Sequence, residues 1–222
     1  MAENLNAFDK HAKEYDKWFD APEGKALFDE EIEAVRLLTG GLDRPFLEIG
    51  VGSGRFAMAL GIEFGVDPSP RLLEMALKRG ISVRKAQGES LPFKDDSFGT
   101  AFILFTLCFV KNPAKVIAEA GRVLKQRGHL IIGIINKESP WGRLYMQKRD
   151  CGHPIYSHAQ FYNVEEVTEM LTAADFSVED YSSTLCQPPS KHLLREEAHA
   201  GFIKNAGFIC ILASKSTSGD RT

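Results

Sequence analysis

The sequence predicts an α/β protein with a mainly parallel sheet. Short apolar runs suited to buried strands alternate with segments of helical periodicity between residues 46 and 135, and this alternation is typical of a parallel sheet flanked by helices. The run 100–105 is almost wholly apolar, as expected of a central strand covered on both faces. The chain has 222 residues, which is enough for one well-buried core and short for two.

Composition argues against several classes of protein. The net charge of −3 lacks the basic excess of a general binder of nucleic acids or anionic membranes. No apolar run approaches the roughly 18 residues of a membrane-spanning helix, and residues 1–6 do not read as a secretory signal. The four cysteines are far apart and form no CxxC pair, which favours free thiols in a reducing compartment. We therefore expect a cytoplasmic protein without a nucleic-acid or membrane partner.

Residues 7–40 predict two helices that are separated at Pro22. Apolar residues recur at helical spacing in both, and in the second helix we expect the acidic side chains on the side opposite the apolar face. Tyr15, Trp18 and Phe19 in the first helix have two interpretations. They either pack into the core or form an aromatic lid over the glycine-rich turn that follows.

The stretch 46–56 predicts a strand, a bare turn and the start of a short helix at 55–60. Its glycines lie two apart, which lets the chain turn sharply and lets a ligand approach the backbone. The next strand, 62–66, ends at Asp67, whose carboxylate can accept hydrogen bonds from both hydroxyls of a ribose. A strand, a glycine-rich turn and a helix N-terminus cradle nucleotide-like ligands, NAD and FAD among them.

The elements that follow keep the same alternation. Ser69 is predicted to cap a helix at 71–79, because Pro70 suits the first helical position. The further predictions are a strand at 81–85, the strand at 100–105, a helix that starts at Asn112-Pro113 and ends at Gly128, and a strand at 130–135.

Residues 136–162 break this pattern. They mix aromatic and basic residues without a clear period, and an irregular stretch of this length inside a compact domain is typical of a lid or a binding loop. After it we expect a helix at 164–174, strands at 177–182 and 207–214, and a disordered polar tail from Lys215.

The glycine spacing distinguishes two kinds of cradle. A dinucleotide-binding turn usually reads G-x-G-x-x-G, which would place its third glycine where this chain has Arg55. Here Glu48 precedes Gly50, Gly52 and Gly54, and E-x-G-x-G-x-G resembles the first motif of class I S-adenosylmethionine (SAM)-dependent methyltransferases. Further stretches that resemble this family, in the same order, are FGVDPS at 64–69, GESLPF at 88–93, DSF at 96–98 and EAGRVLK at 119–125.

These motifs cover about residues 44–135 and are similar to the ubiquinone/menaquinone-biosynthesis type, whose A-x-x-Y-D segment HAKEYD at 11–16 also resembles. The resemblance implies a Rossmann-like class I methyltransferase fold, with a seven-stranded mostly parallel sheet, helices on both faces and a small lid. It implies one methyltransferase domain, 1–222, composed of a helical N-terminal cap (1–40), a SAM-binding core (41–135), a substrate-lid region (136–175), C-terminal strands (176–214) and a tail (215–222).

The resemblance also implies SAM as cofactor and S-adenosylhomocysteine (SAH) as product. Backbone N–H groups near Gly50 and Gly52 would face the methionyl part, and Asp67 the ribose. The adenine contacts of the family fall on the Gly88 N–H and on Gln87, whose side-chain oxygen stands in for the usual Asp. Aromatic faces would cover the sulfonium, because they attract cations. The full set of predicted cofactor residues is Tyr15, Trp18, Glu48, Gly50, Gly52, Gly54, Asp67, Pro68, Gln87, Gly88, Glu89, Leu104 and Phe105.

Methyl transfer from SAM is an in-line displacement. Holding nucleophile, methyl group and sulfur in line contributes much of the acceleration, and a general base is optional. The candidates for such a base, each also explained by packing or by a surface position, are His153, His158, Tyr145 and Tyr156. We expect no metal, because Asp150, Cys151 and the two histidines match no zinc signature.

The acceptor is not readable from these motifs. Cys108-Phe109 stands where many relatives have His-His near the substrate, and Gly99 replaces a usual Asp, so substrate choice need not follow close relatives. We expect a methyltransferase that acts on a small molecule through a nitrogen, oxygen or carbon nucleophile, a small amine among them. RNA or protein methylation, a non-catalytic SAM-binding regulatory module and an NAD-dependent oxidoreductase stay open as alternatives.

Overall fold

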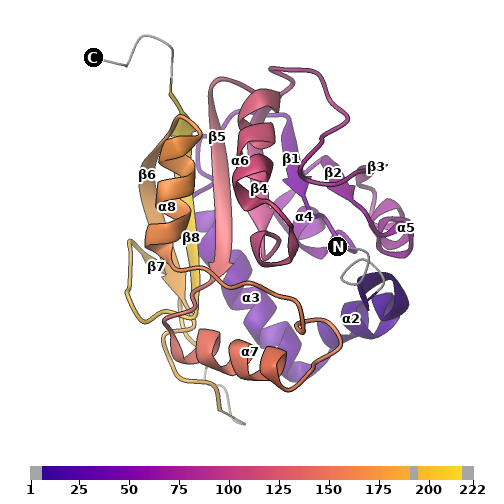
Figure 1. Cartoon of the computed structure of the whole chain (residues 1–222), viewed down its shortest axis with the longest axis vertical. Helices are drawn as coiled ribbons and strands as arrows, with labels where there is room; N and C mark the ends of the chain where they lie inside the picture. Colours follow the sequence, from indigo (N-terminus) through magenta and orange to yellow (C-terminus); the bar gives the residue numbers. More distant parts are fainter. Residues whose placement is uncertain (1–6, 191–194, 217–222) are drawn as a thin grey trace.

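A computed structural model describes residues 7–190 and 195–216 of the chain. These residues form an eight-stranded sheet in the order β3-β2-β1-β4-β5-β8-β6-β7 (Figure 1). Strands β1 to β5 run parallel, and β8 runs antiparallel to both of its neighbours. The predicted α/β class is confirmed, and a two-residue edge strand adds to the seven strands expected. The strands are β1 Phe46–Ile49, β2 Phe64–Asp67, β3 Ser82–Lys85, β4 Phe98–Leu104, β5 Leu124–Ile135, β6 Phe176–Thr184, β7 His199–Ala200 and β8 Phe208–Lys215.

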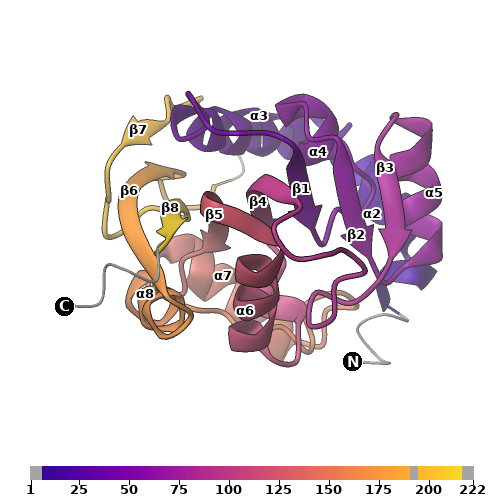
Figure 2. The same ribbon diagram turned by 90° about the horizontal axis from the view of Figure 1, so that it is seen from above.

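Helices cover both faces of the sheet. Figure 2 shows α3 and α4 on one face, with α6 and α8 on the other. Side chains alternate between these layers, as the two-residue period of a strand requires: Leu47 and Ile49 pack with the residues of α6, whereas Phe46 packs with those of α3. The helices are α2 Ala12–Trp18, α3 Pro22–Leu37, α4 Arg55–Leu60, α5 Pro70–Lys78, α6 Pro113–Val123, α7 Pro140–Asp150 and α8 Val164–Ala173, with a 3-10 turn, η1, at Leu107–Phe109.

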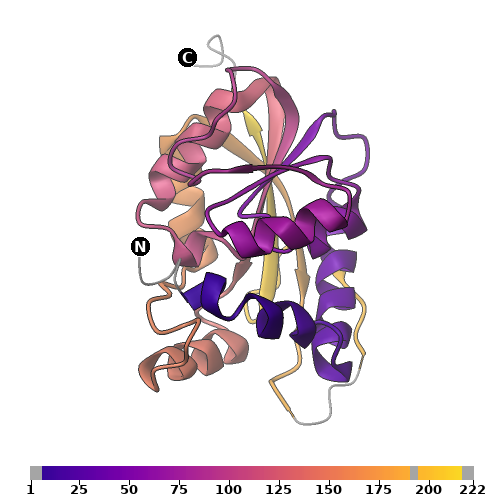
Figure 3. The same ribbon diagram turned by 90° about the vertical axis from the view of Figure 1, so that its right-hand side faces the viewer.

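Two helices lie beyond the carboxyl ends of the parallel strands. They are α2, close to the N-terminus, and α7, which follows β5 (Figure 1, Figure 3). In open α/β sheets this edge is where ligands bind. The positions of α2 and α7 therefore make them the cover of any site built at the strand ends.

The helix α7 corrects the prediction of an irregular segment at 136–162. Ser139 accepts a hydrogen bond from the Gly142 N–H through its Oγ atom, and Pro140 occupies the first helical turn. This is the same cap that was recognised at Ser69, where Oγ accepts from the Leu72 N–H. The aromatic and basic side chains of the segment hid the signal, because they give it no apolar period. Within the segment, residues 136–139 and 151–162 lack regular structure.

Gly128 does not end a helix, which corrects a second prediction. Helix α6 ends at Val123, and Gly128 lies inside β5. A Cβ atom there would lie 2.9 Å from the Gly99 carbonyl oxygen of β4. Glycine is needed at this point for the close approach of two strands, and the ladder between β4 and β5 shifts its register nearby.

The last strand extends into the predicted C-terminal tail. The predicted tail begins at Lys215, which is the last residue of β8, and residues 217–222 lie outside the described residues. Across the described ranges, no helix combines the length and apolarity that crossing a membrane requires.

Candidate functional site

The glycine-rich turn joins β1 to α4 at the carboxyl edge of the sheet. Gly50, Gly52 and Gly54 have φ angles of 82°, 52° and 81°, in the left-handed region that favours glycine. Gly50 and Gly54 also serve packing, because Cβ atoms there would lie 2.2 Å from Thr106 Oγ1 and 2.9 Å from the Ala76 Cβ. A Cβ atom at Gly52 would meet nothing within 4 Å. Gly52 therefore leaves open space beside the backbone.

Asp67 lies at the carboxyl end of β2 and closes this turn. Its Oδ2 atom accepts a hydrogen bond from the Gly52 N–H at 3.0 Å, and its Oδ1 atom accepts one from the Ser69 N–H at 2.8 Å. Burial raises the pKa of Asp67 to about 6, although both hydrogen bonds oppose the shift. Each carboxylate oxygen has a further lone pair, so the side chain is fixed in place and can still accept from a ligand.

Glu48 lies in β1 beneath the turn. It is 2 % exposed, and its Oε2 atom has no hydrogen-bond partner among the described residues. Burial, and then the nearby Asp67 carboxyl, raise its pKa well above the usual range. The side chain is not on the wall of the cavity described next, and Gly54 is not on it either. Both residues shape the turn from below.

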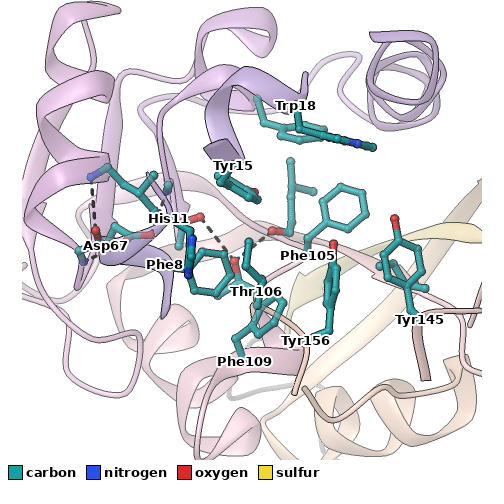
Figure 4. Close-up of a pocket in the computed structure, with 18 of the residues that line it drawn as sticks. Phe8, His11, Tyr15, Trp18, Asp67, Phe105, Thr106, Phe109, Tyr145 and Tyr156 are labelled. Atoms are coloured by element: carbon teal, nitrogen blue, oxygen red, sulfur yellow. Dashed lines mark hydrogen bonds between the residues drawn. The ribbon is translucent and has the colours of Figure 1, made fainter. Parts of the chain in front are cut away.

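A cavity of about 890 Å³ runs along the carboxyl edge of the sheet. Its turn end is formed by the glycine-rich turn, Asp67 and the loop after β3. Its aromatic end is the part of the wall that carries Tyr145 and Tyr156, which Figure 4 shows on the side away from Asp67. The cavity brings together these residues of the predicted set: Tyr15, Trp18, Gly50, Gly52, Asp67, Pro68, Gln87, Gly88, Glu89, Leu104, Phe105, Tyr145, His153 and Tyr156. His158 is exposed and is not on the wall.

The loop after β3 lines the cavity with Ala86, Gln87, Gly88 and Glu89. A Cβ atom at Gly88 would lie 3.0 Å from Val116 and 3.1 Å from Ile49, so glycine lets the loop sit close to the sheet. The Oε1 atom of Glu89 accepts from the backbone N–H of Lys111 at 3.0 Å. This bond fixes the loop to the chain before α6 and leaves the Gln87 side chain at the rim.

The helix α2 holds two aromatic side chains over the cavity. Tyr15, Trp18 and Phe19 all line the cavity, and Phe19, which is 7 % exposed, also packs in the core. The three residues therefore serve as a wall of the cavity, and Phe19 fits both interpretations. Figure 4 shows Tyr15 between Asp67 and the rings of Phe105 and Tyr156.

Charged groups tie α2 to the rest of the site. Asp16 accepts from Arg55 at 2.8 Å and from Arg79 at 2.9 Å. Burial alone would raise the pKa of Asp16, but these hydrogen bonds lower it to about 2. Arg55 also pairs with Asp20. Arg55, which stands where a dinucleotide-binding turn has its third glycine, thus anchors the helical cap.

Phe105 ends β4 in a strained conformation. Its φ angle is 57°, a region that bulky side chains seldom adopt and that is frequent at functional sites. Its ring stacks on Phe208 with the centroids 4.6 Å apart. Sequence reasoning placed Phe105 at the site but missed Thr106, whose Oγ1 atom donates to the Leu104 carbonyl at 3.0 Å and packs against Gly50.

The aromatic end draws on α7 and the loop after it. The rings of Tyr145 and Tyr156 lie edge to face with their centroids 4.8 Å apart, and burial raises the pKa of both phenols. His153 accepts a hydrogen bond from the Ile155 N–H through Nδ1 at 3.2 Å, and burial lowers its pKa. The neutral ring therefore carries its proton on Nε2, where it donates rather than accepts.

Glu31 on α3 is a wall residue that sequence reasoning missed. It is 8 % exposed and lines the cavity. The neighbouring Glu30 is 4 % exposed and accepts from the Glu196 N–H. Both positions correct the expectation that the acidic residues of this helix lie opposite its apolar face. The available signal was two adjacent acids between apolar residues, Leu27 and Ile32, of the buried stripe.

The chain is similar in sequence to a methyltransferase domain family and to several proteins. A methyltransferase domain family matches residues 47–132. An uncharacterised protein of Methanocaldococcus jannaschii is 42% identical over 212 residues, which cover 95% of this chain and 100% of that protein. A demethylmenaquinone methyltransferase of Tropheryma whipplei is 33% identical over 114 residues, 46% of this chain and 47% of that enzyme.

Solved structures agree. A crystal structure of a SAM-dependent methyltransferase of Thermotoga maritima, described as a possible histamine N-methyltransferase, is 36% identical with a TM-score of 0.87, over 96% of this chain and 100% of that one. The strand order and the helices on both faces are thus those of a class I methyltransferase.

Proposed function

Because the chain belongs to the SAM-dependent methyltransferases, we propose that it transfers the methyl group of SAM to a small-molecule acceptor held in the aromatic end of the cavity. The observation that carries this proposal is the single cavity, which joins the glycine-rich turn and Asp67 to an enclosed set of aromatic side chains. A cofactor at the turn end and an acceptor at the aromatic end would then meet inside one space.

The residues at the turn end fit SAM. Gly52 leaves open space beside its backbone, and Asp67 has lone pairs that can accept from both ribose hydroxyls. Gln87 and Gly88 line the cavity, and in this proposal the Gly88 N–H and the Gln87 side chain pair with adenine. Glu48 lies buried beneath the turn and is not on the cavity wall, so its part is to support the turn and not to contact SAM.

When bound, SAM supplies an electrophilic methyl group on a sulfonium, whose leaving group is a neutral thioether. The contribution of this chain is to orient the two reactants and exclude water, which raises their effective concentration. Tyr15 and Trp18 offer aromatic faces that attract the positive charge. His153 and Tyr156 can hold the acceptor by donating hydrogen bonds, so neither needs to remove its proton.

We also propose that three segments of the single domain have separate roles. Residues 1–40 act as the cap over the cofactor, because α2 covers the cavity and is anchored through Asp16. Residues 136–175 act as the acceptor lid, since α7 and the loop after it supply Tyr145, His153 and Tyr156. Residues 41–135 carry the glycine-rich turn, Asp67 and the adenine loop, and thus the SAM-binding core.

The direct test is the melting temperature of the protein with SAM, SAH and NAD. A ligand that binds only the folded chain raises this temperature, and we expect a rise with SAM and SAH but not with NAD. SAH release on incubation with SAM and a panel of small acceptors then reports turnover. No shift with either SAM compound at about 1 mM or above would contradict the proposal.

A further inference from the structure

The Glu31 carboxyl lines the cavity and has no counter-ion among the residues that the structure describes. It is 8 % exposed, and among the described residues no hydrogen bond or ion pair involves its side chain. Burial and the adjacent Glu30 carboxyl raise its pKa well above the usual range, and no cation opposes them. In its ionised form a buried carboxyl in this condition is costly, so it holds a proton until a cationic ligand pairs with it.

The surroundings place Glu31 among the aromatic rings. Its charge contributes to the raised pKa of Tyr145 on α7 and of Tyr15 on α2. Glu31 lines the same cavity as both tyrosines. The group lies where an acceptor would be enclosed and not beneath the glycine-rich turn.

The other charges at this end do not neutralise Glu31. Glu23 also lines the cavity and adds a second negative charge near Tyr145. Lys148 is on the wall, but its ammonium lies over the Tyr145 ring at 4.6 Å and is influenced by Glu23. Burial lowers the pKa of His153, so this side chain stays neutral at physiological pH. Among the described residues of the aromatic end, none of these basic side chains is paired with Glu31.

We propose that Glu31 binds a protonated amino group of the acceptor, which makes the acceptor a small amine with an apolar body enclosed by the aromatic end. Where this nitrogen is the methylated atom, its proton passes to the Glu31 carboxylate, and the freed lone pair then displaces the thioether of SAM from the methyl group. The proposal rests on the proposed function, because it names the substrate class of the same cavity. A carboxylate and surrounding ring faces recognise an ammonium group, and they disfavour a carboxylate or phosphate acceptor.

The test uses the full chain saturated with SAH. Calorimetric titration compares butylamine, phenethylamine and tryptamine with their alcohols, butanol, phenethyl alcohol and tryptophol, and with phenylacetate as an anion. We expect at least one amine to bind about tenfold or more tightly than its alcohol, since a hydrogen-bonded charge pair contributes that much. Phenylacetate should bind more weakly than either.

Glu31→Gln should reduce the affinity for the bound amine to about that for its alcohol, a loss of roughly tenfold or more. It should leave the affinities for the alcohol and for SAH unchanged. The matched control is Glu33→Gln on the same helix, whose carboxylate pairs with Arg195 at 2.7 Å and does not line the cavity. Glu31→Asp should retain part of the preference for the amine.

The outcomes separate the two proposals. If SAH binds but no amine binds up to about 10 mM, or if an alcohol or phenylacetate is preferred, the assignment of Glu31 is overturned while the proposed function stands. An amine affinity that Glu31→Gln leaves unchanged overturns it as well. If SAH itself does not bind, the proposed function fails first.

Discussion

The two ends of the cavity are built in different ways. The turn end consists of backbone at Gly50, Gly52 and Gly88, together with the Asp67 carboxylate, all at the ends of adjacent strands or in loops next to them. The aromatic end consists of side chains from three separate segments, α2, α3 and α7 with its following loop. The position of backbone groups depends on the fold, whereas a wall of side chains can be altered by substitution while the fold stays the same. The two ends should therefore respond separately to substitution.

The largest expected effect is at the turn end. Asp67→Ala should weaken SAH binding about 100-fold, because it removes an acceptor for two ribose hydroxyls and releases the N–H groups of Gly52 and Ser69. Competition binding with a fluorescent SAH analogue measures this loss, and circular dichroism checks that the fold persists. Unchanged affinity in a folded variant would remove Asp67 from the ribose role.

The same carboxylate should give a pH-dependent stability. Its pKa is about 6 in the folded protein and about 3.8 when unfolded, so the folded state holds the proton more tightly. The contribution of Asp67 to stability is therefore full below pH 4 and is lost as the pH rises through 6, by about 2–3 kcal/mol in total.

The measurement is urea unfolding of the wild type and of Asp67→Asn, without cofactor, from pH 4.5 to 7.5. The difference in unfolding free energy between the two proteins should shrink or change sign across this range. A difference that is constant with pH would show that burial does not raise the pKa of Asp67 as described.

A smaller effect is expected where the cap is anchored. Asp16→Asn should weaken SAH binding about tenfold, because Asp16 links α2 to both Arg55 and Arg79. The control is Asp20→Asn, whose side chain is 63% exposed and should change the affinity less than about threefold. Stopped-flow release of SAH should show the loss as faster dissociation. If the two variants weakened SAH binding equally, the ion pairs of Asp16 would not be what holds the cofactor under α2.

The smallest effect should come from the histidines of the lid. His153→Ala should lower turnover with a small acceptor by about three- to tenfold through the loss of one hydrogen bond, with SAH affinity unchanged. His158→Ala should leave turnover as it is, since this side chain is not on the cavity wall. The rate at which SAH forms as product measures turnover in the two variants. If His158→Ala lowered turnover more than His153→Ala, the loop would adopt another arrangement when the acceptor is bound.

The turn end was accessible from the sequence because its geometry is set locally. Glycine spacing, the carboxylate at the end of β2 and the cap at Ser69 follow from short-range rules, and each was placed correctly. The aromatic end was not accessible in the same way. Glu31 was assigned to the outer side of its helix because it is acidic, although it lies four residues after the buried Leu27 and so on the same face. Helix α7 itself was missed because its face toward the cavity mixes aromatic and basic side chains.

The central claim is that the two ends bind separate ligands within one cavity. A paired calorimetric titration tests it, with SAH and with the amine that binds best, in wild type, Asp67→Ala and Glu31→Gln. We predict that Asp67→Ala lowers the affinity for SAH about 100-fold, whereas Glu31→Gln lowers only the affinity for the amine, about tenfold. Loss of SAH binding in a folded Glu31→Gln protein, or SAH binding that Asp67→Ala does not affect, would contradict the claim.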